Sequence, residues 1–325
     1  MAAVEPAGCE LETLLTQSVQ RLIGDSAGMR FGLAVSGGPD SMVLLDLSAR
    51  VFAGRVEAAT VDHGLRPASA SEAAMVADWC AGRNIAHTIL RPAEVATGNI
   101  QQWARTRRYA LLEAWRIERQ IDWVFTAHHA DDQLETVLMR LNRGAGVSGL
   151  AGVRARQGRL LRPLLGARRV QLLAYAEDRG LPFVEDPSNS DPRFDRAVIR
   201  QQLAGAEWLD PVAATRSAAA LAEVTEAIEW AVEGIEARHV RSDRATCILD
   251  RTDFPREFLR RLLLRMLARI DSDYKPRGET IDRALDILGD GGKVSVGKAM
   301  LVGGTQWIVQ AAPARKKSLR KGSTD

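Results

Sequence analysis

The stretch FGLAVSGGPDSMVLLDLSAR, Phe31 to Arg50, decides the fold of the first half of the chain. An apolar run ends at Ser-Gly-Gly, and after Pro39 the apolar residues recur with the period of a helix. The two glycines let the backbone bend and let an anion approach the N–H groups without a Cβ in the way. Pro39 suits the first turn of a helix, whose free N–H groups point back into the loop. The pattern predicts a buried strand, an anion-binding loop and a helix.

The candidate nucleotide-binding residues of this loop are Ser36, Gly37, Gly38, Pro39, Asp40 and Ser41. The two serine hydroxyls can donate hydrogen bonds to phosphate oxygens. A carboxylate beside a phosphate is repelled unless a cation lies between them, so Asp40 implies Mg²⁺. The loop matches neither the lysine-containing P-loop nor the Gly-x-Gly-x-x-Gly fingerprint. Because the first lysine of the chain is Lys275, phosphate binding must rely on arginine, metal and backbone groups. A tight, capped strand-to-helix turn is the competing interpretation.

Four apolar segments, each followed by a helical pattern, make up the region around this loop. The expected strands are 31–35, 56–61, 86–90 and 123–127, and the expected helices are about 10–23, 40–51, 70–82, 99–121 and one that begins at 131. Strands that alternate with helices of this length predict an α/β fold with a parallel sheet covered on both faces. Such folds bind ligands outside the carboxyl ends of the strands, where the strand order reverses.

Polar residues follow other expected strands as well, and we expect them to share a site with the loop. Asp62 and His63 follow the second strand, and a His-His pair that begins at His128 follows the fourth. His128, Asp132 and Glu135 are spaced by four and three residues, so they share one helix face. Zinc would need a further nitrogen or sulfur ligand, so these carboxylates suit Mg²⁺ or a cationic substrate better. A capped loop after the second strand and a solvated helix end after the fourth are the alternatives.

The second half of the chain is expected to be mainly helical. A helix at about 168–179 precedes a polar loop and a short arginine-bearing helix, and an alanine-rich helix follows from 211 to about 240. The segments KVSVGKAMLVGG and TQWIVQAA alternate and meet at Gly-Gly, which predicts a hairpin. The expected parts are a catalytic domain at 1–205, a helical linker at 206–240, a small helical domain with a C-terminal hairpin at 241–313, and a basic disordered tail at 314–325.

The composition of the 325 residues excludes several other classes of protein. Cys9, Cys80 and Cys247 are far apart, which argues for a reducing compartment and against a paired-cysteine metal or redox centre. The N-terminal residues carry acids where an export signal carries positive charge, and no apolar run reaches the length of a membrane span. We therefore expect a cytoplasmic protein with no membrane partner.

The loop SGGPDS resembles the SGGxDS loop of the PP-loop enzymes, or N-type ATP pyrophosphatases. Further blocks occur in the order seen in the tRNA(Ile)-lysidine synthases within that superfamily: VDHGLR, NIQQWARTRRY, AHHADDQLET, LNRGAGVSGLAG and EDPSNSDPRFDRAVIR. The resemblance is strong from about 31 to 203 and looser in the helical region that follows. The last two blocks are the most discriminating, because the whole superfamily shares SGGxDS.

The resemblance implies an adenine nucleotide α hydrolase-like, Rossmann-like domain and a C–N bond-forming ligase. ATP and Mg²⁺ would adenylate the C2 carbonyl of the wobble cytidine in the tRNA(Ile) with a CAU anticodon, and the ε-amine of free L-lysine would then displace AMP. Asp62 and His63 match positions near the adenosine. The matched catalytic positions are Asp40, also the metal position, Arg108, His128, Asp132, Glu135 and Arg200.

One position departs from the family pattern, which has Arg-Asn where this chain has Arg196-Ala197. This difference puts a detail of the local binding in doubt, but the flanking Arg196 and Arg200 remain. The tRNA is expected to bind arginines between 140 and 200 and the helical C-terminal part, and a homodimer is left open. The alternatives are a thiolase-type PP-loop enzyme, which would need reactive cysteines, and a non-catalytic nucleotide- or RNA-binding protein.

Overall fold

The computed structural model describes residues 7–64, 68–94, 98–185, 195–203, 205–243 and 245–312. The chain divides into two compact units, Met1–Ala222 and Glu223–Asp325. Helix α9 (Pro211–His239) contains the boundary between them and covers most of the segment 206–240 that the sequence predicts as a helical linker. The predicted domain limits themselves stay predictions. No helix of the described residues has both the length and the apolar character that a membrane crossing requires.

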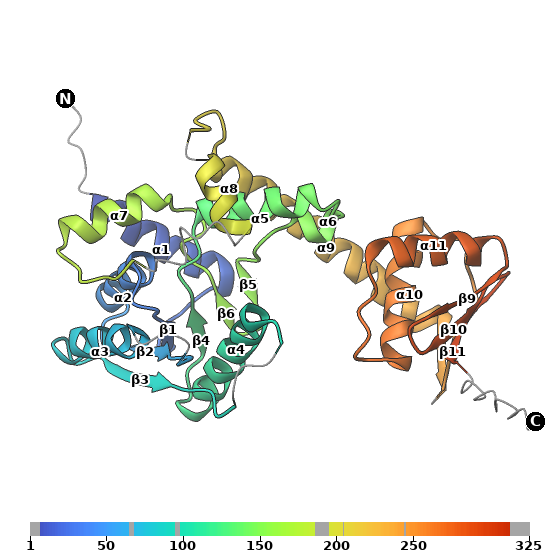
Figure 1. Cartoon of the computed structure of the whole chain (residues 1–325), viewed down its shortest axis with the longest axis horizontal. Helices are drawn as coiled ribbons and strands as arrows, with labels where there is room; N and C mark the ends of the chain where they lie inside the picture. Colours follow the sequence, from blue (N-terminus) through green and yellow to red (C-terminus); the bar gives the residue numbers. More distant parts are fainter. Residues whose placement is uncertain are drawn as a thin grey trace, which may run out of the picture. The chain divides into compact units, whose positions relative to one another are not determined.

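The first unit is built on a six-stranded sheet in the order β3-β2-β1-β4-β6-β5 (Figure 1). The strands are β1 (Phe31–Ala34), β2 (Val56–Val61), β3 (Ala86–Leu90), β4 (Trp123–Phe125), β5 (Arg156–Gln157) and β6 (Leu160–Leu161). All neighbours pair in parallel except the edge strand β5, which forms a hairpin with β6. The predicted parallel sheet is confirmed, and β5 and β6 extend it by two short strands that the sequence pattern did not indicate.

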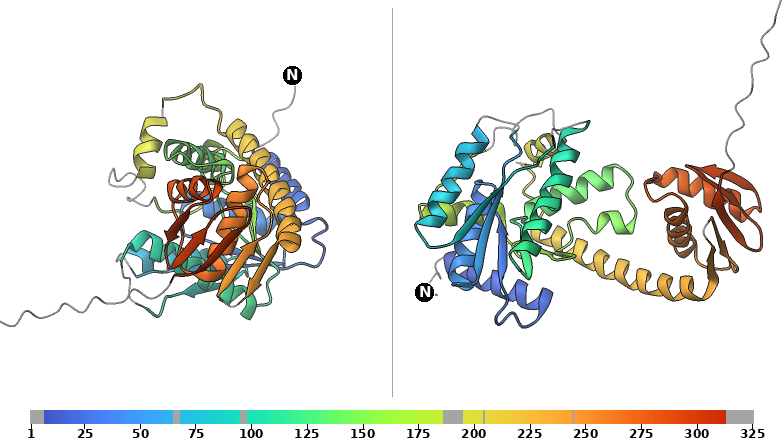
Figure 2. Two further views of the ribbon diagram at one scale, coloured as in Figure 1. Left: turned by 90° about the vertical axis from the view of Figure 1, so that its right-hand side faces the viewer. Right: turned by 90° about the horizontal axis from the view of Figure 1, so that it is seen from below.

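Helices cover both faces of this sheet (Figures 1 and 2). The remaining helices of the unit are α1 (Ala7–Ile23), α2 (Pro39–Val51), α3 (Ala68–Ala81), α4 (Ile100–Glu118), α5 (Ala130–Asn142), α6 (Val147–Leu150), α7 (Arg169–Asp178) and α8 (Asp195–Leu203). The larger core joins β1 to α1, α2, α3 and α7, while α4 packs on the other face. Successive strand residues alternate between these cores, since Ala58 lies in the first and Ala59 in the second.

The centre of the sheet is closely packed around β1. Phe31 lies 4.6 Å from Phe52 and 4.8 Å from Phe125, measured between ring centroids. On the opposite face, a Cβ at Gly32 would come within 2.6 Å of the Trp115 ring, so this strand position requires glycine. A central strand fixed on both faces gives the loop that follows β1 a rigid support.

The order of the strands reverses at β1, because the chain adds β2 and β3 on one side and then β4 on the other. The carboxyl ends of β1 and β4 therefore flank the point where ligands bind in such sheets. The Ser-Gly-Gly loop follows β1, and His128 and His129 follow β4. The sequence predicted that the loop and the histidines lie at one edge of the sheet, and the strand order explains why they do.

The second unit contains a five-stranded antiparallel sheet in the order β7-β8-β11-β10-β9 (Figure 1). Its strands are β7 (Val240–Asp243), β8 (Thr246–Leu249), β9 (Lys293–Val296), β10 (Ala299–Val302) and β11 (Trp307–Ala311), and its helices are α10 (Arg256–Ile270) and α11 (Gly278–Gly289). One face of the sheet shares a core with α10, α11 and the end of α9. The predicted hairpin is present as β10 and β11. The sheet is larger than predicted, because KVSVGKAMLV forms two strands and β7 and β8 add a second hairpin.

Candidate functional site

The loop after β1 has the geometry of an anion-binding turn. Gly37 has a φ of +86°, in the region that favours glycine, and Gly38 is extended and precedes Pro39 at the start of α2. No side chain caps the first N–H groups of α2. The Ser36 N–H donates to the Ser41 hydroxyl over 3.1 Å, and that hydroxyl donates to the Gly38 carbonyl over 2.9 Å. The loop is held by its own serines, and the amino end of α2 remains free to receive an anion.

Asp40 lies in the first turn of α2 with one carboxylate oxygen left unpaired. Its Oδ1 is buried and has no hydrogen-bond partner among the described residues, while its Oδ2 lies 3.6 Å from Nε2 of His129. A buried carboxylate oxygen without a donor is costly unless a cation meets it. The described residues contain no group of three or more His, Cys, Asp or Glu side chains that could hold a metal ion alone. This environment fits Mg²⁺, which binds through one or two carboxylates together with phosphate oxygens and water.

His129, which the sequence analysis did not single out, is the centre of an acidic cluster. Its side chain is almost fully buried, and its ring nitrogens lie 3.5 to 3.6 Å from carboxylate oxygens of Asp40, Asp131 and Asp132. Burial lowers the pKa of this imidazole, but hydrogen bonds to Asp131 and Asp40 outweigh it and raise the pKa to about 10. The Asp132 N–H also points at Nδ1 over 3.4 Å, which would require an unprotonated nitrogen. Because three carboxylates surround the ring, the protonated imidazolium is favoured over the neutral ring that would accept this long hydrogen bond.

The two adjacent histidines face different surroundings. Phe125 and Ala127 pack in the core on the α2 side of the sheet, and His129 continues that alternation towards Asp40. His128 lies on the α4 side, where its Nδ1 is 3.0 Å from the hydroxyl of Thr126. Burial, followed by the charges of nearby arginines, holds the pKa of His128 well below its usual range. His128 is therefore neutral at physiological pH. The sequence motif alone does not separate His129 from His128, because the two rings differ only in the face of the sheet that each one occupies.

Helices α5 and α8 are joined by a network of carboxylates and guanidiniums. Glu135 is only 3% exposed; Arg196 Nε lies 2.8 Å from its Oε2, and Arg200 Nε lies 2.7 Å from its Oε1. Asp132 lies 3.2 Å from Arg196 and 3.7 Å from Arg200. The predicted residues Asp132, Glu135 and Arg200 thus lie together, and with Arg196 they form what we call the Glu135 cluster. Burial lowers the pKa of Arg200, but its hydrogen bond to Glu135 outweighs burial and raises the pKa, and the charges of Glu135, Asp132 and Asp40 add to the rise.

Asp62 and His63 lie apart from this network, at the end of β2. Asp62 accepts hydrogen bonds from the Ser69 hydroxyl over 2.7 Å and the Gly64 N–H over 2.9 Å, and the first of these contributes most to its lowered pKa. This is the loop-capping arrangement that the sequence left as an alternative. His63 has a buried Nδ1 without a partner among the described residues, and its ring meets Trp103 edge-on. The charge of Arg108 helps to lower the pKa of His63.

Arg108 connects the two regions electrostatically. It is half-buried on α4, its guanidinium lies 5.3 Å from the centroid of the Tyr109 ring, and it helps to lower the pKa of both His63 and His128. Ala197, where the family pattern has asparagine, is buried within α8 and offers no polar contact. Of the matched sequence blocks, Leu65-Arg66 and residues 186–194 lie outside the described residues, as does the basic tail.

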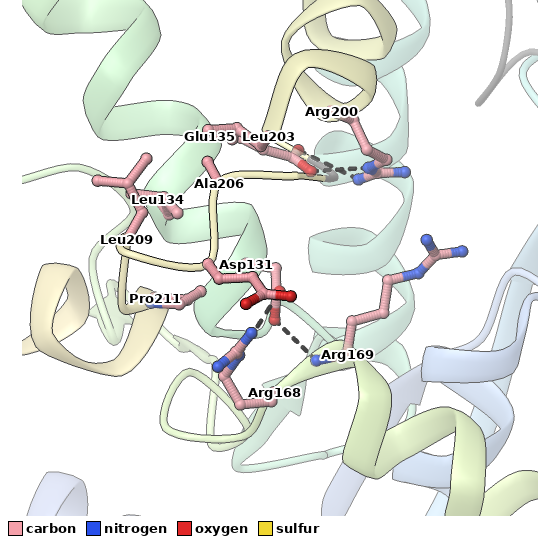
Figure 3. A pocket seen from close by; sticks show the side chains of 11 residues that line it. Asp131, Leu134, Glu135, Arg168, Arg169, Arg200, Leu203, Ala206, Leu209 and Pro211 are labelled. Atoms are coloured by element: carbon pink, nitrogen blue, oxygen red, sulfur yellow. Dashed lines mark hydrogen bonds and ion pairs between the residues drawn. The ribbon is translucent and has the colours of Figure 1, made fainter.

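A pocket of about 480 Å³ opens beside the Glu135 cluster (Figure 3). One wall carries Glu135 paired with Arg200, and the opposite end carries Asp131, which accepts a hydrogen bond from the Arg169 N–H over 2.7 Å. Arg168 lies 3.6 Å from the same Asp131 carboxylate. The apolar part of the lining consists of Leu134, Leu203, Ala206, Leu209 and Pro211. The pocket thus has both a carboxylate and a guanidinium at each end and an apolar wall between them, which suits a small amphipathic molecule that carries both charges.

Comparisons with known proteins show which family this chain is similar to. Residues 11–207 match the family model of the PP-loop domain described as ATP_bind_3. The chain is 39% identical over 315 residues to a tRNA(Ile)-lysidine synthase of Zymomonas mobilis, with 94% of this chain and 95% of that protein covered. It is 46% identical over 270 residues to a protein of the same name from Novosphingobium aromaticivorans, with 81% and 82% covered.

A solved structure shows the same fold at low sequence identity. The U34-tRNA thiolase NcsA from Methanococcus maripaludis aligns with a TM-score of 0.54 and 18% identity, covering 67% of this chain and 80% of that one. At this identity the likeness concerns the fold alone. The sequence relatives, which span nearly the whole chain, carry the more specific information.

Proposed function

This chain belongs to the tRNA(Ile)-lysidine synthase family of PP-loop proteins, and from that premise we propose that it joins free lysine to the wobble cytidine of tRNA(Ile). The main support for the proposal is that an anion-binding loop and a carboxylate cluster lie at the same edge of the sheet, where β1 and β4 end. A free helix terminus with an unpaired Asp40 oxygen lies on one side, and the Asp132–Glu135 cluster lies on the other. An ATP-activated group and a cationic nucleophile can therefore meet there.

ATP would place its phosphates at the amino end of α2. The N–H groups of the loop and the hydroxyls of Ser36 and Ser41 would bind phosphate oxygens. Asp40 would hold Mg²⁺, which would neutralise charge on the polyphosphate. The adenosine would extend towards Asp62 and His63 at the end of the neighbouring strand β2, as the family resemblance implies.

In the first half-reaction, the cytosine C2 carbonyl oxygen would attack the α-phosphorus, and the bond to the β-phosphate oxygen would break. Pyrophosphate leaves, and the base becomes an O-adenylate. Fixed positive charge stabilises the extra negative charge of the pentavalent transition state, and Arg108 would supply it. His128 is neutral because of burial and the nearby arginines, so it can form a hydrogen bond to the base without adding a further charge.

In the second half-reaction, the lysine ε-amine would attack C2 and expel AMP. We place lysine in the pocket of Figure 3, with its ammonium towards Glu135 and its α-carboxylate towards Arg168 and Arg169. The leucines of the pocket would cover its aliphatic stem. Glu135 or the neighbouring Asp132 would take the ammonium proton, since only the free amine is a nucleophile.

The cysteines count against a sulfur-transfer reaction of the thiolase type. Cys80 and Cys247 are buried in the cores of the two units, and Cys9 is exposed on α1. Burial raises the pKa of the Cys80 thiol to about 11, so its reactive thiolate is scarce at neutral pH. None of the three belongs to the loop, the Glu135 cluster or the pocket. The site lacks the nucleophilic sulfur that such a reaction requires.

Incubation with ATP, Mg²⁺, radiolabelled lysine and the CAU-anticodon tRNA(Ile) tests the proposal. We expect label in the tRNA together with one AMP and one pyrophosphate for each lysine transferred. A tRNA(Ile) whose anticodon lacks the wobble cytidine is the matched control and should take no label. Absence of both labelled tRNA and AMP would contradict the proposal and favour a non-catalytic nucleotide- or RNA-binding protein. We place the reaction in the cytoplasm, where the substrates occur together.

A further inference from the structure

A group of arginines lies at the carboxyl ends of β4 and β6, on the side of the sheet that α4 covers. We call it the arginine cluster, and it consists of Arg105, Arg108, Arg140, Arg154 and Arg162. Arg162 directly follows β6, and the Thr126 N–H donates to the Leu161 carbonyl, so Arg162 lies beside the chain that leads to His128. Only Arg108 of the five has a place in the mechanism above.

None of the five has a carboxylate within ion-pair distance in the described parts of the chain. Arg140 donates to the carbonyls of Gly149 and Gly152 over 2.6 and 2.9 Å. Arg162 donates to the Arg154 carbonyl over 2.5 Å and to Gln157 over 3.2 Å. These bonds hold the side chains in place but leave their charges unneutralised. In the Glu135 cluster, by contrast, each arginine meets a carboxylate.

Two buried guanidinium nitrogens of the cluster lack a hydrogen-bond partner among the described residues. They are Nε of Arg162 and Nη1 of Arg154, and Arg162 is only 2% exposed. Buried charged donors are stable in proteins when an acceptor meets them. The unpaired donors of the arginine cluster indicate that the acceptor comes from a ligand.

The titration behaviour of the cluster agrees with an excess of positive charge. Burial is the main cause of the lowered pKa of Arg162, and the charges of Arg105 and Arg108 lower it further. Arg140 shows the same effect from burial, then from Arg154 and Arg105. Burial alone would raise the pKa of Tyr109, but the neighbouring guanidiniums lower it overall. These groups repel one another, and a bound anion would relieve the repulsion.

We propose that the arginine cluster binds a phosphodiester group of the RNA backbone next to the nucleotide that reacts. The proposal rests on the proposed function. A phosphate provides several acceptors for the forked donors of arginine, and phosphate contacts are what fix an RNA in register. Strands β1, β4 and β6 are successive neighbours, so the backbone of Arg162, which follows β6, lies roughly 10 Å from the end of β1. A nucleotide whose phosphate bound there could extend its base towards the ATP loop.

Pyrophosphate released from ATP offers the same chemistry, and the test must separate the two sources. Arg105→Gln and Arg154→Gln each remove one charge, and Arg21→Gln on α1 is the control, because Arg21 is exposed and outside the site. Binding of a fluorescent anticodon stem-loop is measured against salt concentration. A second stem-loop carries an uncharged methylphosphonate in place of a phosphate that flanks the wobble cytidine. Inhibition by pyrophosphate is measured in parallel.

For each cluster variant we expect RNA affinity to fall on the order of tenfold and the salt slope to decrease by about 1. The methylphosphonate should weaken binding by the parent chain and cause no further loss in the variants. Pyrophosphate inhibition and the control should be unchanged. The melting temperature of Arg105→Gln should not fall, since the substitution removes a repelling charge.

Several outcomes would overturn the inference. If the variants bound RNA as tightly as the parent, the cluster would not contact this phosphate. The same would follow if the losses of RNA affinity caused by the substitution and by the methylphosphonate added independently. Weakened pyrophosphate inhibition with unchanged RNA binding would assign the cluster to the leaving group. In each of these cases, the proposed function would still hold if the parent chain transferred lysine to the tRNA. A parent chain that neither binds nor modifies the RNA would contradict both the proposed function and this inference.

Discussion

Asp40 and His129 illustrate how far single residues could be predicted. The need for a cation at Asp40 followed from the sequence, because a carboxylate in a phosphate loop must be neutralised. Its unpaired Oδ1 agrees with that expectation. His129 could not be ranked above His128 from the motif, because the choice depends on which face of the sheet each ring occupies. Only the packing of Ala127 and the contact with Asp40 separate them.

Asp40→Asn should abolish formation of the adenylate and leave tRNA binding nearly unchanged. The amide keeps the shape of the side chain but removes the charge that would hold Mg²⁺, so we expect AMP formation to fall roughly 10²-fold or more. The measurement is the rate of pyrophosphate and AMP release with saturating tRNA.

The control for this substitution is Asp25→Asn, because Asp25 is exposed and accepts a hydrogen bond from the Ala27 N–H within its own turn. The control should keep the parent rate. If Asp40→Asn also released pyrophosphate at the parent rate, the metal role assigned to Asp40 would be wrong.

At the scale of elements, α5 and α8 are joined mainly through Glu135. The sequence predicted both helices and a helix face shared by His128, Asp132 and Glu135. The place of His128 was wrong, because α5 begins at Ala130 and only the two carboxylates lie on it. The sequence did not predict that Arg196 and Arg200, distant in the chain, would both pair with Glu135. Periodicity reports which face of a helix a residue occupies, but not which distant helix it meets. The motif resemblance placed Arg200 in the site, although only the structure identifies its partner.

Glu135→Gln should loosen α8 from α5. Two guanidiniums lose a charged partner, and because both are partly exposed, each pair contributes only about 1 kcal/mol. We expect amide hydrogen exchange in Asp195–Leu203 to rise on the order of tenfold. The KM for lysine should rise as well, since Glu135 lines the pocket in which we place lysine.

The control is Glu177→Gln, an exposed residue on α7. This variant should leave exchange in α8 and the KM for lysine unchanged. Unchanged exchange in the Glu135 variant would show that other contacts hold α8 in place.

The second unit shows where sequence patterns are weakest. Its helices and the β10–β11 hairpin were expected, but β7 and β8 were not. Strand β7 is mostly exposed and carries Arg241, Ser242 and Asp243, so it lacks the alternation that identifies a strand. The turn at Gly297, with a φ of +58°, divides an apparently single strand into β9 and β10. Both features depend on pairing with neighbours that lie far away in the sequence.

At the scale of the whole molecule, the second unit is proposed to contact the tRNA. Trp230 on α9 belongs to this unit and is 79% exposed, which is unusual for so large an aromatic ring. Exposed aromatic rings bind nucleic-acid bases by stacking, a contact of about 1–3 kcal/mol per base. The Glu229 and Glu236 ion pairs with Arg265 hold α9 against α10 and so keep this part of the helix in place.

Trp230→Ala should weaken tRNA affinity on the order of tenfold without changing the rate of AMP formation at saturating tRNA. Trp230→Tyr keeps an aromatic face and should retain most of the affinity. Filter binding with full-length tRNA measures both variants. Equal affinities for Trp230→Ala and the parent would remove this side chain from the proposed RNA contacts.

The central claim is that the ATP loop and the Glu135 cluster act together on one nucleotide of the tRNA. The most direct test treats the CAU-anticodon tRNA(Ile) with the protein, ATP, Mg²⁺ and lysine, and then measures the masses of its nuclease fragments. We expect the wobble cytidine alone to gain one lysine with loss of water, and only when ATP is present. An unmodified cytidine, a gain of sulfur, or lysine at another position would contradict it.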